Sequence, residues 1–177
     1  MNYIIKDVDV LNSKLSPFLR VENEFRIRIM IDRLQPSDFK AILSTVNSET
    51  FTMLLLYNLG FRNHNNQKKY QLNRYFTITN WKEHIINDEE APYPLRFIEV
   101  NGVSNEEIVK YYSGLIKHQV TPMITYFMTA QTMIRFGPFY LDVVSENEQI
   151  IKSLKEQLSG IYETEFDDIE PMTEEDL

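Results

Sequence analysis

The sequence predicts an α+β fold, with an antiparallel sheet from the N-terminal half packed by helices from the C-terminal half and a disordered acidic C-terminal tail. Patterns with a period of two residues dominate the first hundred positions, and helical patterns with capping signals follow them. Hairpin-like connections take the place of the crossovers that a nucleotide-binding sheet needs. We expect one domain over residues 1–162, a tail over 163–177, a sheet of about four or five strands, and two or three helices on one face.

The first sixty residues contain three expected strands and one helix. Residues 1–10 form the first strand, and the run TFTMLLLYNL from Thr50 is a central strand that is apolar on both faces. Between them, Pro36, Ser37 and Asp38 predict the start of a helix that continues to about Val46. Residues 23–34 alternate cleanly, which predicts a half-buried strand with one wet face. Its buried side carries Phe25, Ile27, Ile29 and Ile31, and its wet side carries Arg26, Arg28, Met30 and Asp32.

The middle of the chain predicts a hairpin followed by short elements. A polar turn at residues 63–66 joins the central strand to a returning strand over 69–79. Asn80 with Glu83 resembles a capping box and predicts a brief helix to Asn87. A loop follows over 88–94, and a strand over 95–100 ends in a turn at Asn101 and Gly102.

The last part of the chain reads as helical. Ser104 with Glu107 is a second capping box, and the apolar run after Pro122 predicts a helix that Gly137 and Pro138 end. Residues 139–144 are extended, and Ser145 with Glu148 makes a third capping box. The final helix carries a narrow apolar stripe, which can pack on the body or bind a partner helix. The stripe residues that we consider for partner binding are Ile150, Leu154, Leu158 and Ile161.

The net charge of −8 comes entirely from the end of the chain. From Glu163 onward there are eight acidic residues and no basic one, so the body holds 18 acidic residues against 18 Lys and Arg. Such a run repels itself and buries little, so it should be disordered unless a partner orders it. It is either a solubilising end or a docking tail, and its candidate contact residues are Asp167, Asp168, Glu174 and Glu175.

A basic stretch with interleaved aromatic residues lies between Glu49 and Glu83, where the chain has no acidic residue. Cations that follow a phosphate backbone and rings that stack on bases are typical of single-strand binding. In the simpler interpretation the rings are core residues and the cations are the solvent face of a hairpin. The candidate nucleic-acid residues are Arg62, Lys68, Lys69, Arg74, Tyr70, Tyr75 and Trp81.

Recognisable enzyme signatures are missing from the sequence. The chain has no cysteine, so it has no thiolate nucleophile. Its five glycines are isolated, so the sequence contains no phosphate-binding glycine motif. The three histidines, His64, His84 and His118, lack the spacing of a helical zinc pair. The carboxylates at 88–90 and those of Asp7 and Asp9 complete no metal site. We therefore expect no catalytic residue, no cofactor and no bound metal, and a protein that is not an enzyme.

No apolar run reaches the length of a membrane helix, and the first residues do not form a signal peptide. We expect no membrane span and no secretion through a signal peptide.

The residue usage, poor in Ala and Gly and rich in Asn, Ile, Tyr and Phe, is similar to that of proteins from AT-rich genomes, including large tailed bacteriophages. In size and texture the chain resembles a small tail or baseplate-hub component, or a tail-assembly factor, of a T-even-type phage. The resemblance implies a viral structural protein that works in virion assembly and is located in the host cytoplasm or the virion. It assigns no functional residue.

Three functions remain open from the sequence. The first is a structural or assembly protein that acts through protein–protein contacts within a larger assembly, for which Tyr, Phe and Met are typical interface residues. The second is a single-stranded nucleic-acid-binding protein with a basic, aromatic sheet face and an acidic regulatory tail. The third is an acidic inhibitor of a host enzyme.

Overall fold

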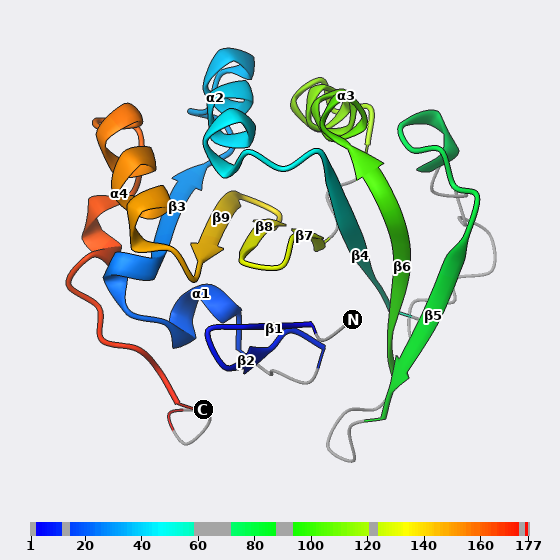
Figure 1. Ribbon diagram of the computed structural model, residues 1–177, viewed down its shortest axis with the longest axis horizontal. Helices are drawn as coiled ribbons and strands as arrows, with labels where there is room; N and C mark the ends of the chain where they lie inside the picture. Colours follow the sequence, from blue (N-terminus) through cyan, green and yellow to red (C-terminus); the bar gives the residue numbers. More distant parts are fainter. Residues whose placement is uncertain are drawn as a thin grey trace.

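The computed structural model describes residues 3–11, 15–58, 72–87, 94–120, 124–173 and 176. Within these ranges the chain forms a seven-stranded antiparallel sheet with helices α2, α3 and α4 across one face (Figure 1). The predicted α+β class is confirmed. A small hairpin and the short helix α1 lie beneath the opposite face, so the middle of the sheet is covered on both sides.

The strands follow the order β3-β9-β8-β7-β4-β6-β5 across the sheet, and each neighbouring pair is antiparallel. Their bounds are Arg26–Met30 (β3), Thr50–Asn58 (β4), Trp81–Ile86 (β5), Leu95–Ser104 (β6), Thr125–Met128 (β7), Thr132–Phe136 (β8) and Tyr140–Ser145 (β9). The expected N-terminal strand is instead a separate hairpin of β1 (Ile4–Ile5) and β2 (Val8–Asp9). Lys6 and Asp7 turn the chain between them with positive φ angles of 47° and 62°.

Helices α2 and α3 begin where the sequence predicts. Helix α2 (Pro36–Val46) starts with proline, and the Asp38 carboxylate accepts a hydrogen bond from the Gln35 amide at 3.0 Å. Helix α3 (Asn105–Ile116) begins with the predicted capping box, in which Ser104 and Glu107 each accept a hydrogen bond from the other's backbone amide. These caps satisfy amides that a helix start otherwise leaves without partners.

Two further helices complete the description. Helix α4 (Glu148–Gln157) is capped by Asn147, whose side chain accepts a hydrogen bond from the Gln149 amide at 3.0 Å. The predicted cap, Ser145, is the last residue of β9. Helix α1 (Pro17–Arg20) is a single turn, and short 3-10 turns occupy Asn23–Phe25, Leu72–Arg74 and Thr164–Phe166.

The apolar run after Pro122 is a β-hairpin, so the predicted helix there is wrong. Strands β7 and β8 pair with Phe127 opposite Ile134, and every residue of β7 is buried. A strand covered on both faces shows no alternation, so periodicity alone cannot separate it from a buried helix. The sheet consequently has more strands than expected, and its centre comes from both halves of the chain.

The expected helix after Asn80 and the turn at Asn101 are also wrong. Residues 81–86 form the edge strand β5, where the Glu83 carboxylate accepts a hydrogen bond from Arg96 Nη1 at 2.8 Å instead of capping a helix. Strand β6 continues through Asn101 and Gly102, with an irregularity in its pairing to β4. Gly102 has φ +76°, a conformation that glycine adopts in a β-bulge.

Strand β3 has no wet face. Ile27 and Ile29 lie in the main core between sheet and helices, as predicted, but Arg26 and Arg28 on the other face are 1% and 9% exposed. Arg26 donates hydrogen bonds to three backbone carbonyls, those of Phe18, Phe166 and Ile169. The N-terminal and C-terminal segments therefore cover the face that was expected to be wet.

Residues 163–173 of the acidic tail pack on the body, which differs from the expected disorder. The Glu163 amide donates to the Arg28 carbonyl at 2.8 Å, and the Met172 amide donates to the Leu19 carbonyl at 2.8 Å. The Phe166 ring packs edge-on against Phe18 at 5.6 Å between centroids. Apolar residues within the acidic run give the tail the contacts that its charge alone would not.

A buried ion pair lies at the centre of this covered face. Arg28 donates from Nε and Nη2 to the two carboxylate oxygens of Asp142 at 2.6 and 2.9 Å, and Arg135 adds a bond to Asp142 at 3.0 Å. The Arg28 guanidinium lies 4.0 Å from the ring centroid of Phe18 and 4.7 Å from that of Phe166. One side chain thus joins the sheet to segments from both ends of the chain.

Replacing Asp142 by Asn should lower the free energy of unfolding by about 3–5 kcal/mol, because it removes the carboxylate that pairs with the buried Arg28 and the partly buried Arg135. Urea unfolding at neutral pH measures the change. The control is Arg33→Gln, which breaks the exposed Arg33–Glu163 pair and should cost less than about 1 kcal/mol. Equal effects of the two substitutions would contradict a structural role for the buried pair.

Candidate interaction surface on the edge strand

The apolar stripe of α4 lies in the core of the protein. Leu154 and Leu158 are 0% and 3% exposed, and Ile150 and Ile161 pack against the same cluster. The stripe could pack on the body or bind a partner helix, and in the structure it packs on the body. These four residues are therefore not presented to a partner in this structure.

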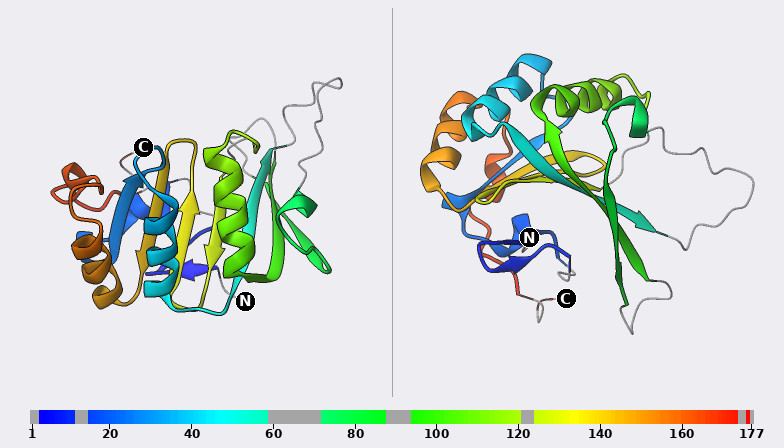
Figure 2. Two further views of the ribbon diagram at one scale, coloured as in Figure 1. Left: turned by 90° about the horizontal axis from the view of Figure 1, so that it is seen from above. Right: turned by 45° about the vertical axis from the view of Figure 1, so that its right-hand side comes forward.

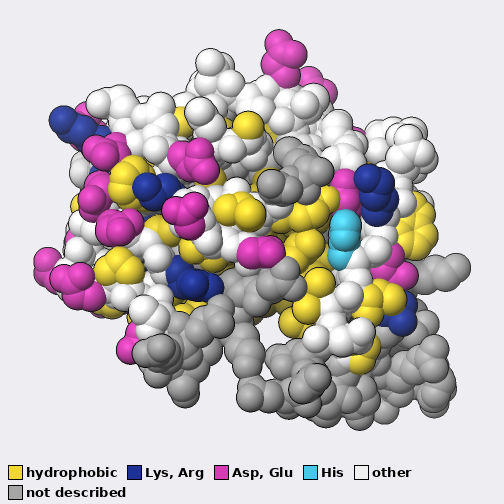
Figure 3. Space-filling model, turned by 60° about the horizontal axis from the view of Figure 1, so that its bottom comes forward, with side chains coloured by type: hydrophobic (Ala, Val, Ile, Leu, Met, Phe, Trp, Pro, Cys, Tyr) yellow, Lys and Arg dark blue, Asp and Glu magenta, His cyan; other side chains and the backbone are white. Residues whose placement is uncertain are grey.

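The acidic candidates divide between the tail's contacts and its surface. Asp167 pairs with Lys155 at 2.8 Å and accepts a hydrogen bond from the Tyr162 hydroxyl at 3.1 Å. Asp168 is exposed, and Glu174 and Glu175 lie outside the described residues. Figure 3 shows acidic side chains gathered on the left of the lower face, the side on which Figure 1 draws the C-terminal segment.

The basic, aromatic candidates do not form one surface where they are described. Tyr75 is 8% exposed and packs edge-on against Tyr111, whereas Arg74 is exposed and Trp81 is 59% exposed on β5. A Cβ atom at Gly114 would lie 2.7 Å from the Tyr75 ring, so that glycine lets the ring pack against α3. Tyr75 is thus a core residue, while Arg62, Lys68, Lys69 and Tyr70 lie outside the described residues.

Strand β5 forms an outer edge of the sheet, at the end farthest from β3 (Figures 1 and 2). Among the described residues, no strand pairs with its outer side. The opposite edge differs, because Tyr162 bridges to Ile29 and covers β3. Trp81 and Ile85 of β5 are 59% and 50% exposed, so this outer strand presents two large apolar side chains at its surface.

The two exposed side chains of β5 lie on the same face. Residues directly opposite in an antiparallel pair share a face, and Trp81, Glu83 and Ile85 lie opposite Val100, Ile98 and Arg96 of β6. Val100 belongs to the core beneath the helices. Trp81 and Ile85 therefore flank Glu83 on the helix-bearing face of the sheet.

A buried polar cluster anchors the other face of β5. Glu99 on β6 is 2% exposed and accepts hydrogen bonds from the Tyr3 hydroxyl at 2.5 Å, from His84 Nε2 at 2.7 Å and from Asn101 Nδ2 at 2.6 Å. The Tyr3 and His84 rings also pack edge-on, with centroids 5.4 Å apart. The cluster ties the N-terminal segment, β5 and β6 together.

The Glu99 carboxylate serves this cluster as an anion. Burial alone would raise the pKa of Glu99, but hydrogen bonds from Tyr3, His84 and Asn101 outweigh it and lower the pKa to about 2. Burial and the neighbouring carboxylate raise the pKa of the Tyr3 hydroxyl. Because an ionised carboxylate only accepts, His84 Nε2 is the donor. A carboxylate held by three donors positions side chains rather than supplying protons at neutral pH.

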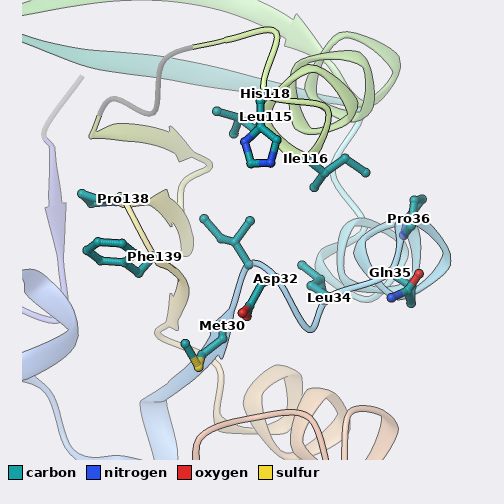
Figure 4. Close-up of a pocket in the computed structure, with 11 residues that line it drawn as sticks. Met30, Asp32, Leu34, Gln35, Pro36, Leu115, Ile116, His118, Pro138 and Phe139 are labelled. Atoms are coloured by element: carbon teal, nitrogen blue, oxygen red, sulfur yellow. The ribbon is translucent and has the colours of Figure 1, made fainter.

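A second exposed apolar group lies at the turn between β8 and β9. Phe139 is 70% exposed there and lines a cavity of about 420 Å³ between the end of β3, the start of α2 and the end of α3. Figure 4 shows Pro138 and Phe139 on one side of the cavity, across from Leu115, Ile116 and His118. Within the described residues, no three His, Asp or Glu side chains form a group that could hold a metal ion.

Sequence reasoning missed both features of β5. The Asn80–Glu83 spacing favoured a helix, which hid the alternation that places Trp81 and Ile85 on one face. Glu99 is the one acidic residue in the mostly apolar run LRFIEV. A charged residue at an inward strand position could have indicated a buried partner, but nothing in the sequence names Tyr3, which is 96 residues away.

Comparison of the chain with protein-family models, with curated proteins and with solved structures gives no match. Across the described part of the chain, none of the helices combines the length and the apolar character that crossing a bilayer requires. The arrangement of side chains is accordingly the basis for the functional proposal.

Replacing Glu99 by Gln should remove a pH-dependent part of the stability. The folded-state pKa is lowered from 4.5 to about 2, so ionised Glu99 stabilises the fold above pH 4.5 and loses this effect as the pH falls toward 2. The advantage of the wild type should be on the order of 3 kcal/mol at pH 7 and vanish near pH 2. Urea unfolding at stepped pH measures it.

Tyr3→Phe is the matched variant, because it removes one of the three donors and should retain part of the pH-dependent difference. A wild-type advantage over Glu99→Gln that stays constant from pH 7 to pH 2 would refute the anchoring role of the ionised carboxylate.

Proposed function

We propose that the protein is a non-enzymatic structural or assembly protein that binds another protein through strand β5. One observation carries the proposal. The outer edge of β5 has no paired strand among the described residues, and this edge strand presents Trp81 and Ile85 on one face. Exposed apolar edges are rare in proteins that act alone, since they pair readily with other chains.

An extended segment of a partner would add to the sheet at this edge. Its backbone would hydrogen-bond with the outer side of β5, and its side chains on the helix-bearing face would cover Trp81 and Ile85. The Glu99 cluster supports this use, because it holds β5 against β6 from the opposite face and presents a prepared strand.

The amino-acid usage, which resembles that of T-even-type phage proteins, provides a setting for this proposal. In that setting the partner is a tail or baseplate component, and the protein acts in the host cytoplasm or the virion. Single-strand binding receives less support, because Tyr75 is a core residue and does not join Trp81 in a stacking surface. The packing of residues 163–173 against the body also limits the acidic surface available to an inhibitor.

A photo-cross-linking residue at position 85, in cells that naturally contain the protein, should yield a covalent adduct with another polypeptide. Mass spectrometry of the cross-linked peptide identifies the partner segment. The same residue at position 156, which is exposed on α4, is the control. Replacing Trp81 by Ser should lower the yield at position 85 by about tenfold, as expected for a central aromatic contact.

Equal yields at positions 85 and 156 would argue against the proposal, since they would indicate random encounters. A cross-link from position 85 to nucleic acid would favour single-strand binding instead.

A further inference from the structure

We propose that the partner of β5 is β5 of a second copy of this chain, paired antiparallel about a two-fold axis that passes beside Glu83. This inference rests on the proposed function and names the occupant of the same edge. It follows from the spacing of the side chains along the strand.

The two exposed apolar residues are placed symmetrically about Glu83. Trp81 precedes it by two positions and Ile85 follows it by two, and all three side chains share a face. In a two-fold antiparallel pair centred on Glu83, Trp81 of each copy lies directly opposite Ile85 of the other. An aromatic residue opposite a β-branched one is a favourable cross-strand pair.

Other two-fold registers lack this match. In an antiparallel pair, residues directly opposite each other must share a face of the sheet. The two-fold axis therefore passes beside a residue and not between two residues, and each change of register moves the axis to the next residue along the strand. Centring on Lys82 places Trp81 opposite Glu83, and centring on His84 places Glu83 opposite Ile85. Only the register centred on Glu83 covers both exposed apolar side chains of β5 with each other. It also overlaps the strand almost from end to end, since β5 spans six residues.

Charges on β6 compensate the like charges that this register brings together. The two Glu83 carboxylates meet at the axis, and each already pairs with Arg96 of its own β6 at 2.8 Å. On the opposite face, Lys82 meets His84 of the second copy, and Lys82 lies opposite Glu99 of its own β6. The two Glu83 carboxylates that meet at the axis thus each have a counter-charge one strand away.

The absence of cysteine from the chain allows a direct test of the register. In an antiparallel pair, opposite Cα atoms are about 4.5–5.5 Å apart, which a disulfide can span. Purified full-length Glu83→Cys should therefore form a covalent dimer under mild oxidation, read on a non-reducing gel. Lys82→Cys is the matched control, because its two sulfur-bearing positions would be diagonal, about 7–8 Å apart, and should not cross-link.

Sedimentation velocity tests the apolar contacts independently. The wild type should show a concentration-dependent monomer–dimer equilibrium, and Trp81→Ser combined with Ile85→Ser should weaken it by at least about tenfold. Phe139→Ser removes an exposed ring that lies outside β5, in the β8–β9 turn, and should leave the equilibrium unchanged. Circular dichroism verifies that each variant is folded.

Cross-linking of Lys82→Cys as efficient as that of Glu83→Cys, or a wild type that stays monomeric while Glu83→Cys fails to cross-link, would overturn the proposed pairing. If Glu83→Cys stays monomeric but position 85 still cross-links to a different protein, the second copy is rejected and the proposed function stands. If neither reaction occurs, both are rejected.

Discussion

The structure depends on one buried ion pair, which lets a sheet keep charged residues on a face that is closed to water. Arg28 and Asp142 lie on the neighbouring strands β3 and β9, and their carboxylate–guanidinium contact is bidentate. Removing either charge from water carries a large desolvation penalty, which the pairing and the surrounding hydrogen bonds must offset. Phe18 and Phe166 can pack over the guanidinium only because this pairing is satisfied.

That arrangement divides the sheet into two parts. Around β3, β9 and β8, both faces are covered, by helices on one side and by the chain's two terminal segments on the other. Around β5, the Glu99 cluster secures the lower face, while Trp81 and Ile85 remain exposed on the other. One end of the sheet is therefore covered on both faces, and the other exposes two large apolar side chains.

How much of this fold could be predicted from the sequence depends on how far apart along the chain the contacting residues lie. Local signals predicted α2 and α3 correctly, because proline at the first position and the Ser104–Glu107 box act within one turn. The hairpin β7–β8 was mistaken for a helix because its faces are both buried, which removes the alternation that marks a strand. Burial by distant segments leaves no local signal.

The same limit applies to the candidate surface. The sequence predicts one basic, aromatic surface, but Tyr75 packs inward against α3 while Trp81 is exposed, and only the tertiary packing separates them. The acidic tail was interpreted by its charge, whereas its contacts come from Phe166 and backbone amides. The composition of a segment therefore does not show which individual residues, such as Tyr75 and Phe166, pack against the rest of the protein.

The bridge between Tyr162 and Ile29 hinders the addition of another strand at the β3 edge of the sheet. A sheet with two open edges can add copies at both ends and polymerise into a fibre. Here the C-terminal segment occupies part of one edge, so the proposed pairing at β5 would use the edge that is unpaired among the described residues of both molecules. Such pairing ends in a closed complex of fixed size rather than an open filament.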